Sequence, residues 1–277
     1  MFTLNCKGRL LVIDKPLVMG IINATPDSFY EGSRFSGTDK ILAQAEKMIL
    51  EGATILDLGG QSTRPGSEKV SEDEELGRVI EGIDAIHRKF PETIISIDTY
   101  HSTVAKKSVQ AGASIVNDIS SGGMDTEMLS TVAALRVPYI AMHMKGTPQT
   151  MQQQSNYENV TREILDFFIR KKQECKVMGI TDVIIDPGFG FAKTIAHNFQ
   201  LLKDLSVFKI LDVPLLVGLS RKSSVYKTLG ISPEEALNGT TVLHTMALAN
   251  GATILRVHDV KEANEAVKLF GKVSGKW

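Results

Sequence analysis

Short apolar runs alternate with longer amphipathic segments along most of the chain. The runs are rich in Val, Ile and Leu and are apolar at successive positions, which is typical of strands buried on both faces of a parallel sheet. The predicted strands are Leu17–Ile22, Thr54–Leu58, Thr93–Ile97, Ser114–Val116, Pro138–Met142, Asp182–Ile185, Pro214–Val217 and Thr253–Val257. The intervening segments predict helices, among them Lys40–Leu50, Glu72–Lys89, Thr103–Gln110 and Gly239–Ala249, several of them followed by a glycine that suits a helix C-terminus: Gly52, Gly112 and Gly251.

The size of the repeat indicates a closed barrel. Eight strand–helix units in 277 residues average about 35 residues each, the usual size of one βα unit. We therefore predict an α/β fold in which residues 1–277 form one domain, a single (β/α)8 TIM barrel. An open, doubly wound sheet is the competing fold. Before the first unit, Thr3–Leu4 and Arg9–Ile13 flank a polar turn and predict a short N-terminal β-hairpin that covers the bottom of the barrel.

Composition and charge narrow the classes of function. The chain is 43% apolar and 23% charged with a net charge of −1, which excludes disorder and gives no support to a nucleic-acid or anionic-membrane surface. The apolar runs are far shorter than the roughly 20 residues that span a bilayer, and the first ten residues lack the apolar run of a signal peptide. Cys6 and Cys175 have neither CxxC nor zinc spacing, so we expect free thiols in a cytoplasmic protein.

Polar side chains follow the predicted strands, where a barrel of this kind builds its chemistry. They are Asn23, Asp57, Asp98, Asn117, His143, Asp186, Ser220, Arg256 and His258. This pattern favours one shared polar pocket. Two members have a second interpretation, because Asp57 could simply orient a loop and His143 could be packed in the core.

The pocket residues suggest a ligand with two different ends. Carboxylates at Asp98 and Asp186, with the carboxamide of Asn117, can bind the N–H-rich edge of a flat nitrogen heterocycle. Lys222 and the Arg256–His258 stretch lie after the seventh and eighth strands, where barrels frequently bind phosphate. A dinucleotide fingerprint and a P-loop are both absent from the sequence. A heterocycle carrying a phosphate or diphosphate therefore fits best.

Loop motifs extend this picture. The stretches INATPDSFYEGSRF, from Ile22, and GGQSTRPGSEKV, from Gly59, supply hydroxyl groups and backbone donors suited to an anion. Together with SIDT, VNDISSG, MHMKGTPQTMQ, IIDPGFGF, GLSRKS and GTTVLHTMALANGATILRVHDV, they make the chain closely resemble the bacterial dihydropteroate synthases over Gly20 to Val260. The departures are small: the first loop reads FYEGSRF where a Gly pair is usual, and Gln61 replaces a more usual Glu.

The resemblance implies a reaction and a set of site residues. 6-Hydroxymethyl-7,8-dihydropterin diphosphate would condense with 4-aminobenzoate to give 7,8-dihydropteroate and diphosphate. The family's pterin contacts correspond to Asp98, Asn117, Asp186 and Lys222, of which Asp98, Asp186 and Lys222 would be catalytic. Its diphosphate contacts correspond to Asn23, Thr63, Arg256 and His258, with Mg²⁺ near Asn23, and its aminobenzoate site to Phe29, Thr63, Pro65 and Ser223. A homodimer is also implied.

Three other functions are weighed against this one. A pterin-binding methyltransferase domain would share the Asp and Asn contacts, but it would not need the STRPG loop or the anion site at Arg256 and His258. A Schiff-base aldolase would use Lys222 as its nucleophile, and the Asp and Asn cluster gives it no support. A barrel that only binds a pterin would not need a diphosphate site.

Overall fold

The computed structural model describes residues 1–24, 37–61 and 70–275. Its strands are β1 (Phe2–Cys6), β2 (Arg9–Ile13), β3 (Leu17–Asn23), β4 (Ile55–Gly59), β5 (Ile94–Asp98), β6 (Ile115–Asp118), β7 (Tyr139–Met142), β8 (Val183–Asp186), β9 (Leu216–Val217) and β10 (Ile254–Val257). The α-helices are α1 (Gly37–Leu50), α2 (Glu72–Lys89), α3 (Ser102–Ala111), α4 (Met128–Leu135), α5 (Val160–Met178), α6 (Ile195–Lys203), α7 (Ser223–Leu229), α8 (Leu237–Ala249) and α9 (Val260–Ser274). Two 3₁₀ helices cover Met151–Gln154 and Leu205–Leu211.

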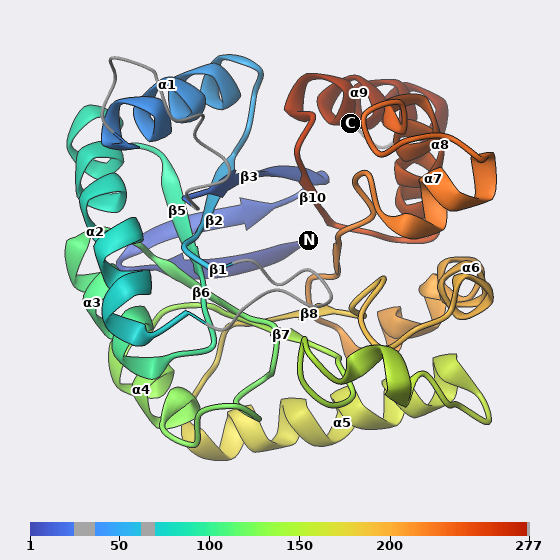
Figure 1. The fold of residues 1–277 in the computed structure, drawn as a ribbon, viewed down its shortest axis with the longest axis horizontal. Coiled ribbons are helices and arrows are strands. Elements are labelled where there is room, and N and C mark those ends of the chain that lie inside the picture. Colours follow the sequence, from blue (N-terminus) through green and yellow to red (C-terminus); the bar gives the residue numbers. More distant parts are fainter. Residues whose placement is uncertain (25–36, 62–69, 276–277) are drawn as a thin grey trace.

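Eight parallel strands form a barrel inside a ring of helices (Figure 1). The strand order is β8-β7-β6-β5-β4-β3-β10-β9. The two ends of this order meet through a parallel bridge between Ile185 and Leu215 and a hydrogen bond from Ile185 N to Pro214 O of 3.0 Å. The closed barrel is confirmed, and the open doubly wound sheet is excluded.

Alternation along the strands separates two apolar regions. Residues that point outward, such as Leu56, Ile95 and Val116, belong to a large core packed under the helices. Their inward-pointing neighbours, such as Ile55 and Ile94, form a second apolar cluster that lies inside the barrel at the strand starts. The barrel interior is therefore filled at its N-terminal end, which leaves only the C-terminal end for a site.

The N-terminal hairpin closes the bottom of the barrel, as predicted. Leu4, Leu11 and Ile13 join the inner apolar cluster and are almost fully buried. Asn5 N donates to Asp182 Oδ2 at 2.7 Å, and Lys7 Nζ donates to Val109 O at 2.7 Å, so the hairpin also binds the residue before β8 and the last turn of α3. This plug keeps water from the lower layer of the barrel.

Several smaller expectations can be compared with the structure. Gly52, Gly112 and Gly251 have φ values of 96°, 133° and 105°, the left-handed region in which glycine commonly ends a helix. Cys6 and Cys175 are buried free thiols, as expected. Across the part of the chain that the structure describes, no helix combines the length and the apolar character needed to cross a membrane.

Candidate active site

A polar layer lies above the apolar floor of the barrel. Asp57, Asp98 and Asn117 stand at alternate positions above Ile55, Ile94 and Ile115, so they point inward by the two-residue period of a strand. Asp98 and Asn117 are opposite each other in the pairing of β5 with β6. Side chains predicted to share a pocket from the ends of the strands thus point into the same end of the barrel.

Arg256 connects two of the carboxylates. From β10, its Nε donates to Asp57 Oδ2 and its Nη2 donates to Asp98 Oδ2, each at 2.6 Å. Asn117 Nδ2 donates to the same Asp57 oxygen at 3.0 Å. Asp57 is completely buried, and the sequence allows it to orient a loop or to serve in the pocket. The structure shows that it orients Arg256 and Asn117.

The ionisation of Asp98 is finely balanced. Burial raises the pKa of this carboxyl to about 7, and Arg256 opposes the rise while Asp57, Asp118 and Asp186 add to it. Its second oxygen, Oδ1, is buried and has no hydrogen-bond partner among the described residues. Such an orphaned acceptor costs free energy unless a ligand donates to it, which makes this oxygen a binding position.

Asp186 and Lys222 form the other side of the layer. Gly188 N donates to Asp186 Oδ1 at 2.8 Å, and Lys222 Nζ donates to Phe189 O in the loop that follows β8. Burial raises the pKa of Asp186, with Lys222 opposing the shift. Burial lowers the pKa of Lys222 to about 8, and Asp186 limits that fall. Each charge of this pair therefore helps the other to stay ionised in a buried place.

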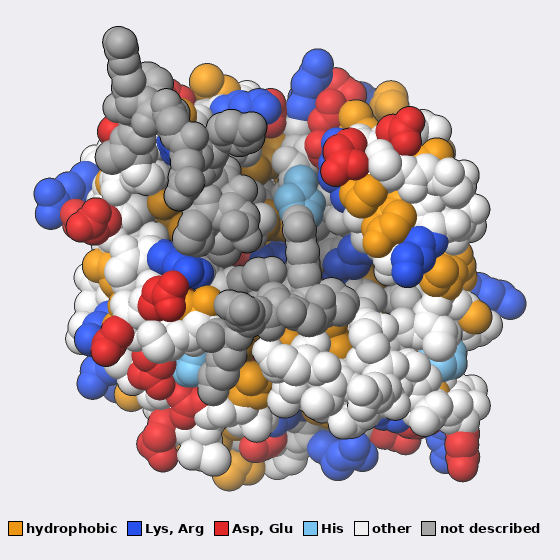
Figure 2. Space-filling model, in the orientation of Figure 1, with side chains coloured by type: hydrophobic (Ala, Val, Ile, Leu, Met, Phe, Trp, Pro, Cys, Tyr) orange, Lys and Arg blue, Asp and Glu red, His pale blue; other side chains and the backbone are white. Residues whose placement is uncertain are grey.

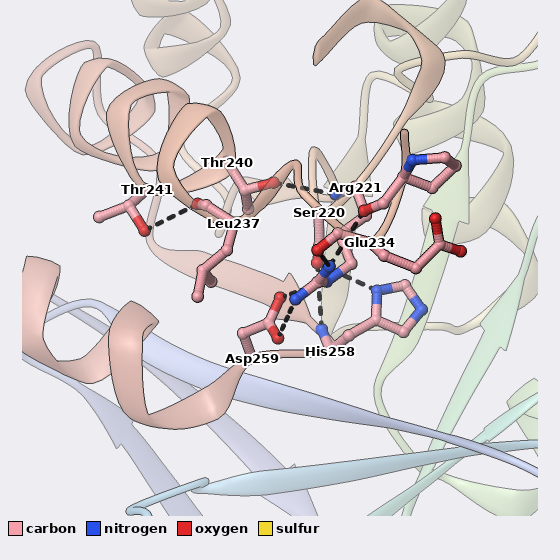
Figure 3. A network of polar contacts seen from close by, with 9 residues as sticks. Ser220, Arg221, Glu234, Leu237, Thr240, Thr241, His258 and Asp259 are labelled. Carbon is pink, nitrogen blue, oxygen red and sulfur yellow. Dashed lines mark hydrogen bonds and ion pairs between the residues drawn. The ribbon is translucent and has the colours of Figure 1, made fainter. Parts of the chain in front are cut away.

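The loops after β9 and β10 are joined by a polar network (Figure 3). Ser220 Oγ lies 3.0 Å from His258 Nδ1 and accepts a hydrogen bond from His258 N at 3.2 Å. Arg221 makes a bidentate pair with Asp259, at 2.8 and 2.9 Å, and its backbone N donates to Thr240 Oγ1. This network fixes the loop that carries Lys222, and of its members Ser220 and His258 are among the site residues predicted from the sequence.

The remaining predicted site residues fall into two groups. Asn23 ends β3 with an exposed side chain, and Ser223 begins α7 directly after Lys222. Phe29, Thr63 and Pro65 lie outside the described residues. Basic and histidine side chains are visible near the centre of the face in Figure 2, which looks onto the barrel in the direction of Figure 1.

His143 is not part of the shared pocket. Its ring packs edge-on against Phe167, with centroids 5.0 Å apart, and its Nδ1 lies 3.1 Å from Lys193 Nζ. Burial and Lys193 lower the pKa of His143 far below the ordinary value, so the ring is neutral. The packed interpretation of His143 is the correct one. Its partner Lys193 was not singled out from the sequence, where a lysine is expected to be exposed.

Comparison with known proteins agrees with this geometry. The family model described as pterin binding enzyme matches residues 19–258. The dihydropteroate synthase of Escherichia coli strain K12 is 43% identical over 265 residues, which cover 95% of this chain and 93% of that protein. A structure of Xanthomonas albilineans dihydropteroate synthase with 4-aminobenzoic acid is 38% identical, with a TM-score of 0.92 and 98% coverage of both chains. A Yersinia pestis dihydropteroate synthase in a sulfonamide drug complex is 40% identical, with a TM-score of 0.93 over 99% of this chain and 100% of the other.

Proposed function

The chain belongs to the pterin-binding enzyme family and, within it, to the dihydropteroate synthases, and we propose from this premise how its residues carry out the reaction. The enzyme is a transferase of folate biosynthesis that joins 6-hydroxymethyl-7,8-dihydropterin diphosphate to 4-aminobenzoate and releases diphosphate. The observation that carries the proposal is the orphaned Oδ1 of Asp98, held beside Asn117 in a buried layer of carboxylates.

The pterin ring binds with its N–H-rich edge toward the carboxylates. The 2-amino-pyrimidinone edge of a pterin presents parallel N–H donors, which a carboxylate can accept together. Asp98 Oδ1 provides a free acceptor, and Asp186 at the end of β8 supplies a second carboxylate. Asn117 can both donate and accept, so it reads the ring beside them. Lys222 contributes a cation that keeps Asp186 ionised.

The diphosphate binds toward the rim. His258 is exposed and lies against Ser220, and Arg256 binds two of the carboxylates of the layer. Positive charge here stabilises the departing diphosphate, and stabilisation of developing charge is usually the largest catalytic contribution. Departure leaves a pterin-methyl cation, whose charge Asp98 and Asp186 are placed to balance.

Asn23 supports a magnesium site that depends on the substrate. Among the described residues there is no group of three or more His, Cys, Asp or Glu side chains that could hold a metal alone. The exposed carboxamide of Asn23 is a neutral oxygen donor, and Mg²⁺ typically combines few protein oxygens with substrate phosphates and water. When bound, Mg²⁺ would neutralise charge on the diphosphate. The donor set fits an ion that arrives with the substrate.

The amine attacks without a covalent enzyme intermediate. The amine of 4-aminobenzoate is a weak neutral nucleophile, which suits attack on an electron-poor methyl carbon. Ser223, which begins α7 directly after Lys222, would bind the carboxylate of 4-aminobenzoate. The loops that contain Phe29, Thr63 and Pro65 would complete this site and exclude water, a competing nucleophile.

A homodimer in the cytoplasm completes the proposal. Apolar side chains on α7 and α8 are exposed, namely Leu229, Val242 and Met246 at 55%, 45% and 50%. Hydrophobic side chains gather on this side of the molecule in Figure 2. Exposed apolar patches of this kind mark interaction surfaces. Sedimentation velocity of the wild type and of Met246→Glu tests the dimer, which the variant should weaken.

The decisive experiment measures diphosphate release. Pterin diphosphate with 4-aminobenzoate and Mg²⁺ should give rapid release, and omission of either 4-aminobenzoate or Mg²⁺ should slow it. Asp98→Asn should lower turnover at least about tenfold, because the loss of a charge-assisted acceptor costs on the order of 1.5–3 kcal/mol. Equal turnover in wild type and Asp98→Asn would remove the pterin assignment. Borohydride trapping of Lys222 by a carbonyl substrate would instead support the aldolase alternative.

A further inference from the structure

One buried lysine has no place in the reaction described so far. Lys193 lies between β8 and α6 and is only 4% exposed. Its Nζ is 2.9 Å from both Gly188 O and Phe191 O, 3.3 Å from His143 O and 3.1 Å from His143 Nδ1. Burial lowers the pKa of Lys193 well below its ordinary value, and Asp186 opposes that fall. Three of the four partners are carbonyl oxygens that only accept, and the three N–H donors of the charged ammonium match them.

The loop around this ammonium has an unusual backbone. Between Asp186 and Lys193, three residues have left-handed φ values: Gly188 at 72°, Gly190 at 83° and Ala192 at 50°. A Cβ on Gly188 would lie 2.1 Å from His143 O, so the chain passes against the neighbouring loop with no room for a side chain. A segment of this kind keeps its shape only when the surrounding structure holds it.

The other side of the same loop faces the site. Gly188 N donates to Asp186 Oδ1 at 2.8 Å, and Phe189 O accepts from Lys222 Nζ. Lys222 Nζ also lies over the ring of Phe191, 4.9 Å from the ring centroid. The carbonyls bound by Lys193 therefore alternate along the chain with the groups that hold Asp186 and Lys222. Both side chains thus depend on the shape of this one loop.

We propose that Lys193 is a positioning residue for the reaction, because its ammonium holds the β8–α6 loop in the shape that places Asp186 and Lys222 against the pterin. It acts through the loop and not by contact with substrate. The inference rests on the pterin roles given above to Asp186 and Lys222. A residue needed only for stability would instead affect the free energy of unfolding and leave the kinetics of the folded enzyme unchanged.

Lys193→Met tests this role, with Lys203→Met as the control. Methionine keeps the length of the side chain and removes its donors, while Lys203 is an exposed lysine on α6. In the folded Lys193→Met enzyme, kcat should fall at least about tenfold, since small misplacements of catalytic groups have effects of this size. The KM for pterin diphosphate should rise, and amide exchange should increase in the peptide that covers residues 186–193 but not in the strands. The control should match wild type in kcat, in KM and in amide exchange.

A second anchor of the loop provides an independent variant. Asn198 Oδ1 accepts from Gly190 N at 2.8 Å, so Asn198→Ala loosens the same loop and leaves Lys193 in place. It should show the same faster local exchange with a smaller loss of kcat. His143→Phe removes one of the four acceptors and keeps a packed ring, so its kcat should stay within about threefold of wild type, as three carbonyl partners remain.

The outcomes separate the inference from the proposed function. Wild-type kcat and KM in folded Lys193→Met, or faster loop exchange in Asn198→Ala with unchanged turnover, would overturn the positioning role. A loss of kcat in His143→Phe as large as that in Lys193→Met would overturn it too. The contact of Lys193 with the His143 ring, and not its contacts with the loop carbonyls, would then account for the effect. Unchanged turnover in Asp186→Asn would contradict the pterin assignment itself, whatever Lys193→Met shows.

Discussion

The replacement Arg256→Met removes the cation that two buried carboxylates share. Arg256 donates to Asp57 and Asp98 at 2.6 Å each, and its side chain is 20% exposed, against 0% for Asp57 and 9% for Asp98. Methionine fills similar space but leaves both carboxylates without this partner. We expect a large loss of stability, because removal of one member of a buried ion pair leaves charge uncompensated in a place of low polarity.

The size of the loss depends on pH in a definite direction. Burial raises the pKa of Asp98 to about 7 in the folded protein, above an unfolded value of about 3.9. A carboxyl whose folded pKa is raised destabilises the fold above that pKa, and the penalty fades as the pH falls toward the unfolded value. Arg256 opposes the rise, so its removal enlarges the penalty mostly at alkaline pH. The variant should lose about 3–5 kcal/mol at pH 8 and less at pH 6.

Urea unfolding followed by circular dichroism at pH 6, 7 and 8 measures this difference. The matched control is Arg88→Met, which breaks a 3.0 Å ion pair between Arg88 and Asp84. The Arg88 side chain is 78% exposed. An exposed pair contributes about 0–1 kcal/mol, so the control should be nearly neutral at every pH. A loss in Arg256→Met that is the same at pH 6 and pH 8, or is no larger than that of the control, would refute the electrostatic argument.

Three further predictions concern turnover and the barrel floor. The value of kcat/KM for pterin diphosphate should rise through pH about 7, as Asp98 ionises, and fall above pH about 8, as Lys222 loses its proton. Lys222→Arg should remove the alkaline fall, and a flat profile from pH 6 to 9 would contradict both assignments. Ser220→Ala should raise the KM for pterin diphosphate about threefold to tenfold, because His258 loses a hydrogen-bond partner; steady-state kinetics checks it, and an unchanged KM counts against the anion site. Leu4→Ala should lower the free energy of unfolding by about 2–5 kcal/mol in urea titrations with KM unchanged, since Leu4 packs in the floor; an altered KM would mean that the hairpin affects the site.

The barrel could be predicted from the sequence because burial on both faces leaves a strong pattern. All eight strands begin and end within two residues of the predicted bounds, and the shortest of them shows what the pattern lacks. Pro214–Val217 was expected, but only Leu216–Val217 forms the strand β9. Leu215 instead makes an isolated bridge to Ile185 that closes the barrel. An apolar run indicates burial and does not indicate which neighbour completes a ladder.

The members of the site were easier to predict than their partners. Asp98, Asn117 and Asp186 could be placed together because every parallel strand ends at the same edge. The choice of Asp57 and Asp98 as partners of Arg256 joins positions 199 and 158 residues apart in the chain, and it depends on the register of the closed barrel. Lys193 shows the other limit. Its sequence context is that of an exposed lysine, and only the loop carbonyls in three dimensions explain its burial.

The order of charges from floor to rim determines how the substrate enters. The carboxylates of Asp57, Asp98 and Asp186 are almost fully buried, Arg256 is partly exposed, and His258 is exposed. A pterin that enters ring first brings N–H donors to the buried acceptors and leaves its diphosphate near the outer cations. The reverse orientation would place phosphate oxygens against carboxylates in a buried layer, where like charges repel strongly and one group would have to take up a proton. The charge order therefore selects one orientation of the substrate. In that orientation the breaking bond lies between the negative layer and the positive rim. The layer favours the pterin-methyl cation, and the rim favours the departing diphosphate.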